Sequence, residues 1–190
     1  MQKLIDRIKK DGVGIGTEIL KVDTFLNHQV DVELNEEIGK EFARIFKDCG
    51  ATKVLTVEAS GITAAYATAK AMGNLPFVFA KKAAPNTMKD GKYVAPVKSF
   101  TKGTLSTVNI SKAALKAGDK VLIIDDFLAT GEAAISLLDL CRQAGAKCVG
   151  YGAVIEKEWQ GGHKRLEDLG YDVESLAIVT SINDDDIKFK

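Results

Sequence analysis

The sequence has few cysteines, no excess of either charge and no long apolar run, and each of these absences excludes a class of protein. The three cysteines, Cys49, Cys141 and Cys148, are odd in number and have no Cys-x-x-Cys spacing, which argues against a disulfide framework and a zinc site. The 26 Lys and Arg residues match the 26 Asp and Glu residues. A generally basic nucleic-acid-binding protein is therefore not expected, although a local basic patch would not show in this sum.

Membrane spans and targeting signals are also not expected. The longest uncharged stretch, residues 59–69, has 11 residues, well short of the roughly 18 apolar residues that suggest a membrane span. The first ten residues, MQKLIDRIKK, predict an amphipathic helix and lack the apolar segment of a signal peptide. With no repeat or linker, the 190 residues are expected to form one domain, residues 1–190, in the cytoplasm.

Glycine and proline divide the chain into segments whose patterns alternate between strand and helix. Strands are predicted at residues 53–57, 76–80, 121–124, 147–155 and 173–178, and helices at residues 31–49, 62–72, 131–144 and 162–169. Residues 93–100 and 105–110 predict a hairpin, residues 81–92 an exposed loop and residues 181–190 a solvated end. The repeated strand–helix–strand units favour the α/β class, with a mainly parallel twisted sheet flanked by helices on both faces.

The most informative polar residues follow the apolar run at residues 121–124. In open parallel sheets, ligands bind beyond the carboxyl ends of the strands. Thr130 and Gly131 open the next helix, whose free N–H groups suit a phosphate, and the carboxylates of Asp125 and Asp126 suit ribose hydroxyls. Taken alone, the same residues also fit an ordinary turn at Asp126 and a helix N-cap at Thr130.

The segment VLIIDDFLATGEA resembles the phosphoribosyl-diphosphate-binding motif of the type I phosphoribosyltransferases. Other segments fit that family. Glu58, Ala59, Ser60 and Gly61 lie where the family has its pyrophosphate-binding loop, and Lys81 and Lys82 open a stretch that resembles its flexible closing loop. The resemblance implies the type I phosphoribosyltransferase fold and 5-phospho-α-D-ribose 1-diphosphate (PRPP) as a substrate. It also implies Mg²⁺ carried on the diphosphate of PRPP.

Within that family, five segments resemble the bacterial xanthine phosphoribosyltransferases. They are LKVDTFLNHQ, EASGI, VFAKK, SFTK and VIEK, and together with the motif they extend the resemblance over essentially the whole chain. This implies a purine salvage enzyme that makes xanthosine 5′-monophosphate and pyrophosphate from xanthine and PRPP. It also implies a cytoplasmic homodimer with small-molecule substrates and neither nucleic-acid nor membrane partners, in which residues 1–30 contribute a small hood over the base.

The resemblance assigns a role to each matching residue. It implies that the catalytic residues are Asp125, Asp126 and Lys81. It implies that the residues that bind PRPP are Ala129, Thr130, Gly131, Glu132 and Ala133 at the 5′-phosphate, and Glu58, Ala59, Ser60, Gly61 and Lys82 at the pyrophosphate. For the base, it implies Leu20 as an apolar wall, Asn27 as a hydrogen-bonding side chain and Lys157 as a donor to the 6-oxo group. Phe127 fits either stacking on the purine or a place in the core.

Two residues depart from patterns within the family. Glu132 places a negative charge beside the expected phosphate, which is unfavourable unless its side chain points away. Ala129 stands where the hypoxanthine-guanine enzymes have an aspartate that is proposed to assist proton transfer. Xanthine is partly anionic near neutral pH and needs less help from a protein base, so Ala129 supports xanthine as the substrate.

Two other functions stay open. One is a PRPP-sensing regulator of the same fold, although residues before 53 match the hood rather than a DNA-binding domain. The other is an enzyme that prefers guanine or hypoxanthine, because Lys157 reads only the 6-oxo edge; adenine has a donor there and is expected to be rejected. No metal site is expected on the protein itself, since His28 and His163 are isolated and residues 184–186 resemble a metal cluster in composition only.

Overall fold

The computed structural model describes residues 1–82, 91–98 and 105–190. Its centre is a six-stranded sheet with the order β10-β9-β8-β7-β3-β4. The strands are β3 (Lys53–Val57), β4 (Phe77–Ala80), β7 (Lys120–Leu128), β8 (Lys147–Lys157), β9 (Val173–Asn183) and β10 (Asp186–Phe189). Neighbouring strands are parallel except for β10, which pairs antiparallel with β9. The predicted α/β class with a mainly parallel sheet is confirmed.

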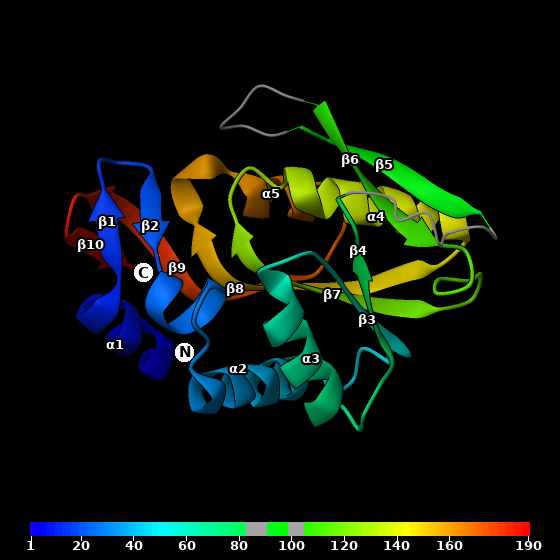
Figure 1. Cartoon of the computed structure of the whole chain (residues 1–190), viewed down its shortest axis with the longest axis horizontal. Coiled ribbons are helices and arrows are strands. Elements are labelled where there is room, and N and C mark those ends of the chain that lie inside the picture. The colour runs from blue at the N-terminus through cyan, green and yellow to red at the C-terminus, as the bar shows by residue number, and fades with distance from the viewer. Residues whose placement is uncertain (83–90, 99–104) are drawn as a thin grey trace.

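Helices cover both faces of this sheet (Figure 1). One face packs against α1 (Gln2–Asp11), α2 (Val32–Ile45) and α3 (Gly61–Ala71), and the other against α4 (Glu132–Ala144) and α5 (Gly162–Glu167). Along β7, Leu122 and Ile124 belong to the first core, and Val121 and Ile123 to the second. Successive side chains of a strand point to opposite faces, so the part of β7 that serves two cores, residues 121–124, must be apolar at every position, as the sequence predicted.

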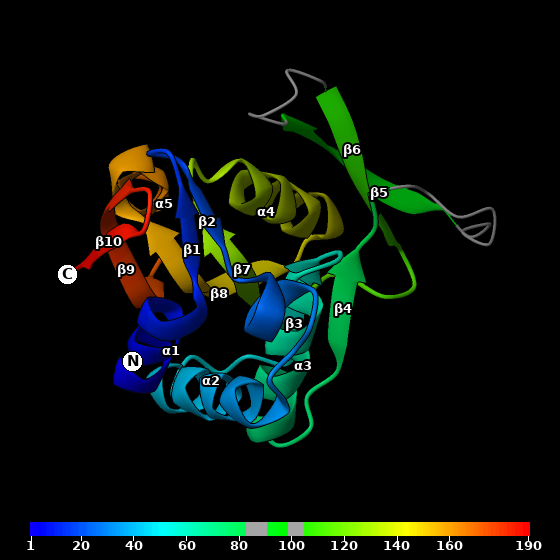
Figure 2. The ribbon, with the colours of Figure 1, turned by 60° about the vertical axis from the view of Figure 1, so that its left-hand side comes forward.

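The N-terminal residues form a small unit beside the carboxyl end of β8. Strand β1 (Val13–Ile15) pairs antiparallel with β2 (Ile19–Lys21), and a π-helical turn, η1 (Asp23–Asn27), follows. In Figure 2 this hairpin stands over the end of the sheet at which β8 and α5 meet. The glycine-rich residues 12–16 therefore follow a helix and form part of a hairpin, which is not the strand–turn–helix context of a dinucleotide-binding loop.

The predicted hairpin is confirmed as β5 (Lys92–Lys98) paired antiparallel with β6 (Leu105–Ser111). It forms a separate two-stranded sheet that extends from the body of the molecule over α4 (Figure 2). Residues 99–104, between the two strands, and most of the loop predicted at residues 81–92 lie outside the described residues.

Several boundaries differ from the sequence prediction by a few residues; α2, for example, ends at Ile45 and not at residue 49. Two further differences concern the ends of strands. Strand β7 does not end at residue 124 but continues to Leu128, because Asp125 and Phe127 still pair with Ala153 and Ile155 of β8. The C-terminal residues are not a solvated end, because β9 runs to Asn183 and turns into β10. The buried Ile182 and the partly buried Phe189 anchor this hairpin to the core. Among the described residues, no helix combines the length and hydrophobicity that crossing a membrane requires.

Candidate active site

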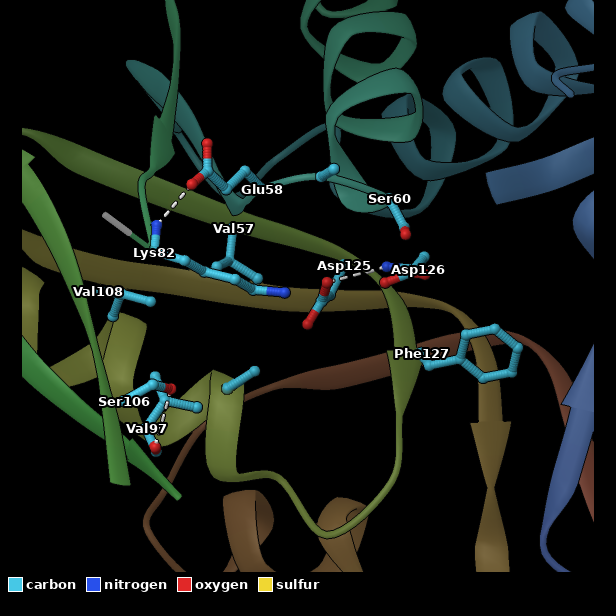
Figure 3. A pocket seen from close by; sticks show the side chains of 12 residues that line it. Val57, Glu58, Ser60, Lys82, Val97, Ser106, Val108, Asp125, Asp126 and Phe127 are labelled. Atoms are coloured by element: carbon cyan, nitrogen blue, oxygen red, sulfur yellow. Dashed lines mark hydrogen bonds between the residues drawn. The ribbon is translucent and has the colours of Figure 1, made fainter. Parts of the chain in front are cut away.

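A pocket of about 220 Å³ opens at the carboxyl ends of β3 and β7, where ligands of parallel sheets bind. Eight of the residues that line it were predicted as site residues: Glu58, Ala59, Ser60, Lys82, Asp125, Asp126, Phe127 and Ala133. Val57 of β3 and three residues of the β5–β6 hairpin complete the lining: Val97, Ser106 and Val108. Figure 3 shows these side chains converging from the hairpin, the β3–α3 loop and the end of β7.

The two aspartates occupy different environments although they are neighbours in β7. Asp125 is 3% exposed; its Oδ1 accepts from the Asp126 N–H at 3.0 Å and its Oδ2 from the Tyr151 hydroxyl at 3.3 Å. Burial, together with the charge of Asp126, raises the pKa of Asp125 well above its ordinary value. Asp126 is half-buried, and burial also raises its pKa. The inner carboxyl is thus held in place and the outer one is more accessible to a ligand.

The loop after β3 contributes the second wall. Glu58, Ala59 and Ser60 lie between β3 and the first turn of α3, and the peptide bond between Glu58 and Ala59 is cis. The Lys82 N–H donates to Glu58 Oε1 at 2.6 Å, which joins this loop to the end of β4. The Lys82 side chain then extends across the pocket toward the aspartates (Figure 3). A lysine beside two carboxylates and a run of loop N–H groups can hold a polyphosphate.

Lys81 differs from Lys82 in its placement. Its backbone forms an antiparallel bridge with Asn109, and its Nζ lies 5.7 Å from the centroid of the Phe79 ring. Lys81 is absent from the residues that line the pocket, so the structure does not bring this predicted catalytic side chain to the aspartates. Its catalytic role stays a prediction.

The loop between β7 and α4 forms an adjoining hollow of about 180 Å³. All five residues predicted at the 5′-phosphate line it: Ala129, Thr130, Gly131, Glu132 and Ala133. Gly131 has a φ of +82°, a left-handed conformation that a residue with a Cβ rarely adopts. Because α4 begins at Glu132, its first N–H groups have no partner within the helix and are free to bind an anion.

Of the four residues predicted at the base, Leu20 and Asn27 belong to the N-terminal unit, Lys157 contacts it, and Phe127 lines the pocket. Lys157 ends β8, and its Nζ donates to the Glu18 carbonyl oxygen of the β1–β2 turn at 2.6 Å. The same Nζ lies 5.5 Å from the centroid of the Phe127 ring, which lines both hollows. Burial lowers the pKa of Lys157. Leu20 is buried in β2 and Asn27 is half-buried at the end of η1; neither lines the pocket beside the aspartates.

The described residues contain no group of three or more His, Cys, Asp or Glu side chains that is arranged to hold a metal ion. The acidic side chains of the pocket, Glu58, Asp125 and Asp126, offer oxygen atoms, the ligand type that Mg²⁺ prefers. They fit an ion that arrives on a ligand better than an ion held by the protein alone. The cysteines lie elsewhere, and burial raises the pKa of Cys141 to about 12 and of Cys148 to about 11, as suits unreactive thiols.

Comparison with known proteins places this geometry in a family. Residues 29–189 match the phosphoribosyl transferase domain family. The xanthine phosphoribosyltransferase of Lactobacillus delbrueckii subsp. bulgaricus is 49% identical over 189 residues, which cover 100% of both chains. That of Staphylococcus epidermidis is 52% identical over 182 residues, which cover 96% of this chain and 94% of the relative. The chain belongs to the phosphoribosyltransferase family.

Solved phosphoribosyltransferases share the fold at low sequence identity. The enzyme from Giardia lamblia, solved as an adenine phosphoribosyltransferase complexed with 9-deazaadenine, is 22% identical with a TM-score of 0.77 over 92% of this chain and 96% of that chain. The adenine phosphoribosyltransferase from Rhodothermus marinus is 22% identical with a TM-score of 0.74 over 94% of this chain and 100% of that chain. The predicted type I phosphoribosyltransferase fold is thereby confirmed.

The sequence analysis missed the residues that hold the side chains and backbone of the candidate site in place. Tyr151 holds Asp125, Glu18 holds Lys157, and Arg165 contacts both Thr130 and Glu132. Each partner lies between 26 and 139 positions away in the chain. No local pattern in the sequence reports contacts of that range, so only the folded structure reveals them.

Proposed function

We propose that this phosphoribosyltransferase acts in purine salvage and converts xanthine and PRPP to xanthosine 5′-monophosphate and pyrophosphate. The observation on which the proposal rests is that three features lie close together at one edge of the sheet. They are a pair of carboxylates, a free helix N-terminus and a lysine beside an aromatic ring. The names of two relatives about half identical over nearly the whole chain support xanthine as the base.

In this proposal the loop before α4 binds the 5′-phosphate and the aspartates bind the ribose. The N–H groups of residues 130–133 and the Thr130 hydroxyl donate to phosphate oxygens, aided by the positive end of the helix dipole. Asp126 accepts from the ribose hydroxyls, and Asp125 supports it from the buried side. The loop from Glu58 to Gly61 and the side chain of Lys82 then face the diphosphate, and Lys81 is proposed to act there as well.

We propose that Mg²⁺ enters on the diphosphate of PRPP, as part of the substrate. There it offsets the negative charge of the departing pyrophosphate. Glu58, Asp125 and Asp126 supply oxygen atoms near that position, and Mg²⁺ keeps several of its own waters in such sites. No side chain of the protein is required to form a covalent bond with either substrate.

The reaction then needs positioning and electrostatic stabilisation. The bond between ribose C1′ and the diphosphate oxygen breaks, a purine nitrogen forms a bond to C1′, and the purine loses one proton overall. Xanthine has partly lost a proton near neutral pH, so Ala129 in place of a protein base does not prevent the step. Positive charge that develops on the sugar lies next to Asp125 and Asp126, which stabilises it.

The base is recognised by residues on the side of the pocket nearest to the β1–β2 hairpin, the predicted hood. Lys157 donates to the 6-oxo group, and its Nζ has three N–H bonds, of which the Glu18 carbonyl takes one. Phe127 offers its ring to the purine face, Leu20 an apolar wall and Asn27 an amide for a further oxygen of the base. Adenine is disfavoured because its 6-amino group and Lys157 are both donors.

We further propose that the enzyme is a cytoplasmic homodimer that acts on small molecules and has neither nucleic-acid nor membrane partners. The resemblance to the bacterial xanthine phosphoribosyltransferases supports the dimer. The balance of 26 basic and 26 acidic residues supports the lack of nucleic-acid binding.

The proposal is tested by nucleotide formation with Mg²⁺, PRPP and one of four bases: xanthine, guanine, hypoxanthine or adenine. The wild type is expected to turn over xanthine with a kcat/KM at least about tenfold above that for any other base. Lys157→Ala is expected to lower kcat/KM for xanthine about 100-fold because a charged donor to the base is lost. Lys188→Ala on β10, which removes an exposed lysine, serves as the matched control.

Efficient turnover of adenine would contradict the role of Lys157 and leave the family assignment intact. A preference for guanine or hypoxanthine would replace xanthine in the proposal. Binding of PRPP without turnover of any base would instead favour a PRPP-sensing regulator.

A further inference from the structure

The outer side of the loop that precedes α4 is closed by α5. The Gly162 N–H donates to the Ala129 carbonyl oxygen at 2.9 Å, and Arg165 Nη1 donates to the Thr130 carbonyl oxygen at 3.1 Å. A Cβ at position 162 would lie 2.3 Å from the Ala129 oxygen, so the two backbones are in direct contact. Two successive carbonyl groups of the loop are therefore bound to α5.

Glu132 is the residue of this loop that works against binding an anion. It is the first residue of α4, where a carboxylate repels an incoming phosphate and competes with it for the free N–H groups of the helix. Its side chain is 31% exposed, so it is free to swing unless a partner holds it. That partner is Arg165, whose Nη1 lies 2.7 Å from Glu132 Oε1.

The ion pair between Arg165 of α5 and Glu132 of α4 differs from the exposed surface pair that Lys164 of α5 makes with Asp168. Lys164 Nζ lies 2.9 Å from Asp168 Oδ1, four residues along, and the two side chains are 79% and 62% exposed. Arg165 instead bridges two elements and contacts both the side chain of Glu132 and the backbone of Thr130. A planar guanidinium with several N–H groups in a fixed arrangement suits such a double contact.

We propose that Arg165 is a positioning residue for the 5′-phosphate of PRPP, because it holds the Glu132 carboxylate against α5 and offsets its charge. The inference rests on the proposed function. It explains how a loop with an acidic residue at the start of α4 binds a phosphate. Arg165 acts through Glu132 and the loop backbone, and the N–H groups of α4 make the phosphate contacts.

The test compares four variants with the wild type in two assays. Calorimetry with ribose 5-phosphate reports on the phosphate loop alone, and steady-state kinetics give KM for PRPP and kcat separately. Arg165→Ala is expected to weaken ribose 5-phosphate binding and raise KM for PRPP about tenfold, with kcat within about threefold, because an uncompensated carboxylate then faces the phosphate. Glu132→Gln keeps the backbone N–H at the start of α4 and removes the carboxylate that repels the phosphate, so ribose 5-phosphate is expected to bind somewhat more tightly, by up to about threefold.

The double variant Glu132→Gln/Arg165→Ala decides the question. Once the carboxylate is gone, Arg165 has no charge to offset, so binding is expected to return to within about threefold of the wild type. Lys164→Ala removes one positive charge from the same helix and is expected to have no effect on either assay. If Arg165→Ala does not fold, Arg165→Gln keeps a donor for the Thr130 carbonyl without the charge and takes its place.

Unchanged binding by Arg165→Ala, or a loss that Glu132→Gln fails to restore, would overturn the inference while the proposed function stands. If the wild type binds neither ribose 5-phosphate nor PRPP, the proposed function fails and this inference fails with it. If it binds both but turns over a base other than xanthine, only the choice of base changes.

Discussion

At the scale of single residues, the buried carboxyl of Asp125 is the group whose ionisation burial opposes strongly. It lies at the end of a strand between two cores and faces Asp126, and the Tyr151 hydroxyl and the Asp126 N–H are its hydrogen-bond donors. A carboxylate so far from water costs free energy. In the proposed function this cost is offset because the pair suits a sugar that carries positive charge in the reaction. The buried charge of Asp125 therefore lowers the folding stability at the position where the proposed reaction uses it.

The raised pKa of Asp125 predicts how the folding stability depends on pH. The unfolded chain ionises Asp125 near 3.8, whereas burial raises the pKa of Asp125 in the folded protein. The contribution of Asp125 to folding stability is therefore fully present below about pH 4 and is lost as the pH rises from there through the raised pKa. Asp125→Asn removes this loss, so its melting temperature is expected to exceed that of the wild type by a few degrees at pH 7, on the order of 1 kcal/mol.

Differential scanning fluorimetry from pH 4 to pH 8 measures the difference. The gain is expected to grow with pH and to vanish near pH 4. Asp139→Asn is the control, because Arg142 lowers the pKa of Asp139 and its replacement has no such gain to offer. A gain for Asp125→Asn that is absent at pH 7, or equal at every pH, would show that burial of the charge does not limit stability.

Sequence reasoning located the residues of the site better than their surroundings. Asp125, Asp126 and the loop at residues 129–133 carry a local motif, and the structure brings them to adjoining hollows. It could not foresee that Lys82 rather than Lys81 enters the pocket, because strand pairing of Lys81 with Asn109 decides which lysine turns inward. Tyr151 and Arg165 had no local signal at all.

At the scale of elements, the β5–β6 hairpin depends on α4 for its position. Val94 lies on the free edge of β5, and the Gln143 side chain satisfies both of its backbone groups. Gln143 Oε1 accepts from the Val94 N–H at 3.3 Å and Nε2 donates to the Val94 carbonyl at 2.8 Å. The glutamine thus takes the place of a neighbouring strand. This matters to the site because Val97 of the same strand lines both hollows.

Removing this contact is expected to loosen the edge of β5. In Gln143→Ala the Val94 amide is expected to exchange its hydrogen about three to ten times faster, as suits the loss of one or two exposed hydrogen bonds. Hydrogen exchange followed by NMR measures the rate. Arg142→Ala, whose side chain pairs with Asp139 on the same helix, is the control and should leave the rate unchanged. Equal protection of Val94 in both variants would mean that Gln143 does not hold the strand.

Elements with strong hydrophobic periodicity were predicted closely, and those that tertiary contacts define were not. The strand at residues 53–57 has the predicted bounds because its short apolar run ends at polar loops. Strand β7 runs four residues further than predicted, since pairing with β8 overrides the polar side chains of Asp125 and Asp126. The C-terminal hairpin was missed because three consecutive aspartates indicate solvent, whereas Ile182 and Phe189 on either side of them pack into the core.

At the scale of the whole molecule, one edge of the sheet collects most of the groups to which the proposed reaction assigns a role. Parallel strands bring the ends of β3, β7 and β8 together, and the helices that follow β3 and β7 begin there. The hood hairpin approaches this edge through the contact of Lys157 with Glu18, and the β5–β6 hairpin from the other side. Residues from positions 57 to 151 thereby line one pair of adjoining hollows. Glu18 and Arg165 contact Lys157 and the loop before α4 from outside these hollows.

The most direct test of this account is the affinity for PRPP with Mg²⁺, measured by calorimetry on the wild type, Asp126→Asn and Asp185→Asn. Asp126 borders the pocket, whereas Asp185 is an exposed residue of the β9–β10 turn and serves as the matched control. Asp126→Asn is expected to weaken binding at least about tenfold, because a charged acceptor for the ribose hydroxyls is lost, and Asp185→Asn is expected to leave it unchanged. Equal affinity in all three proteins would place the PRPP site elsewhere and contradict the account.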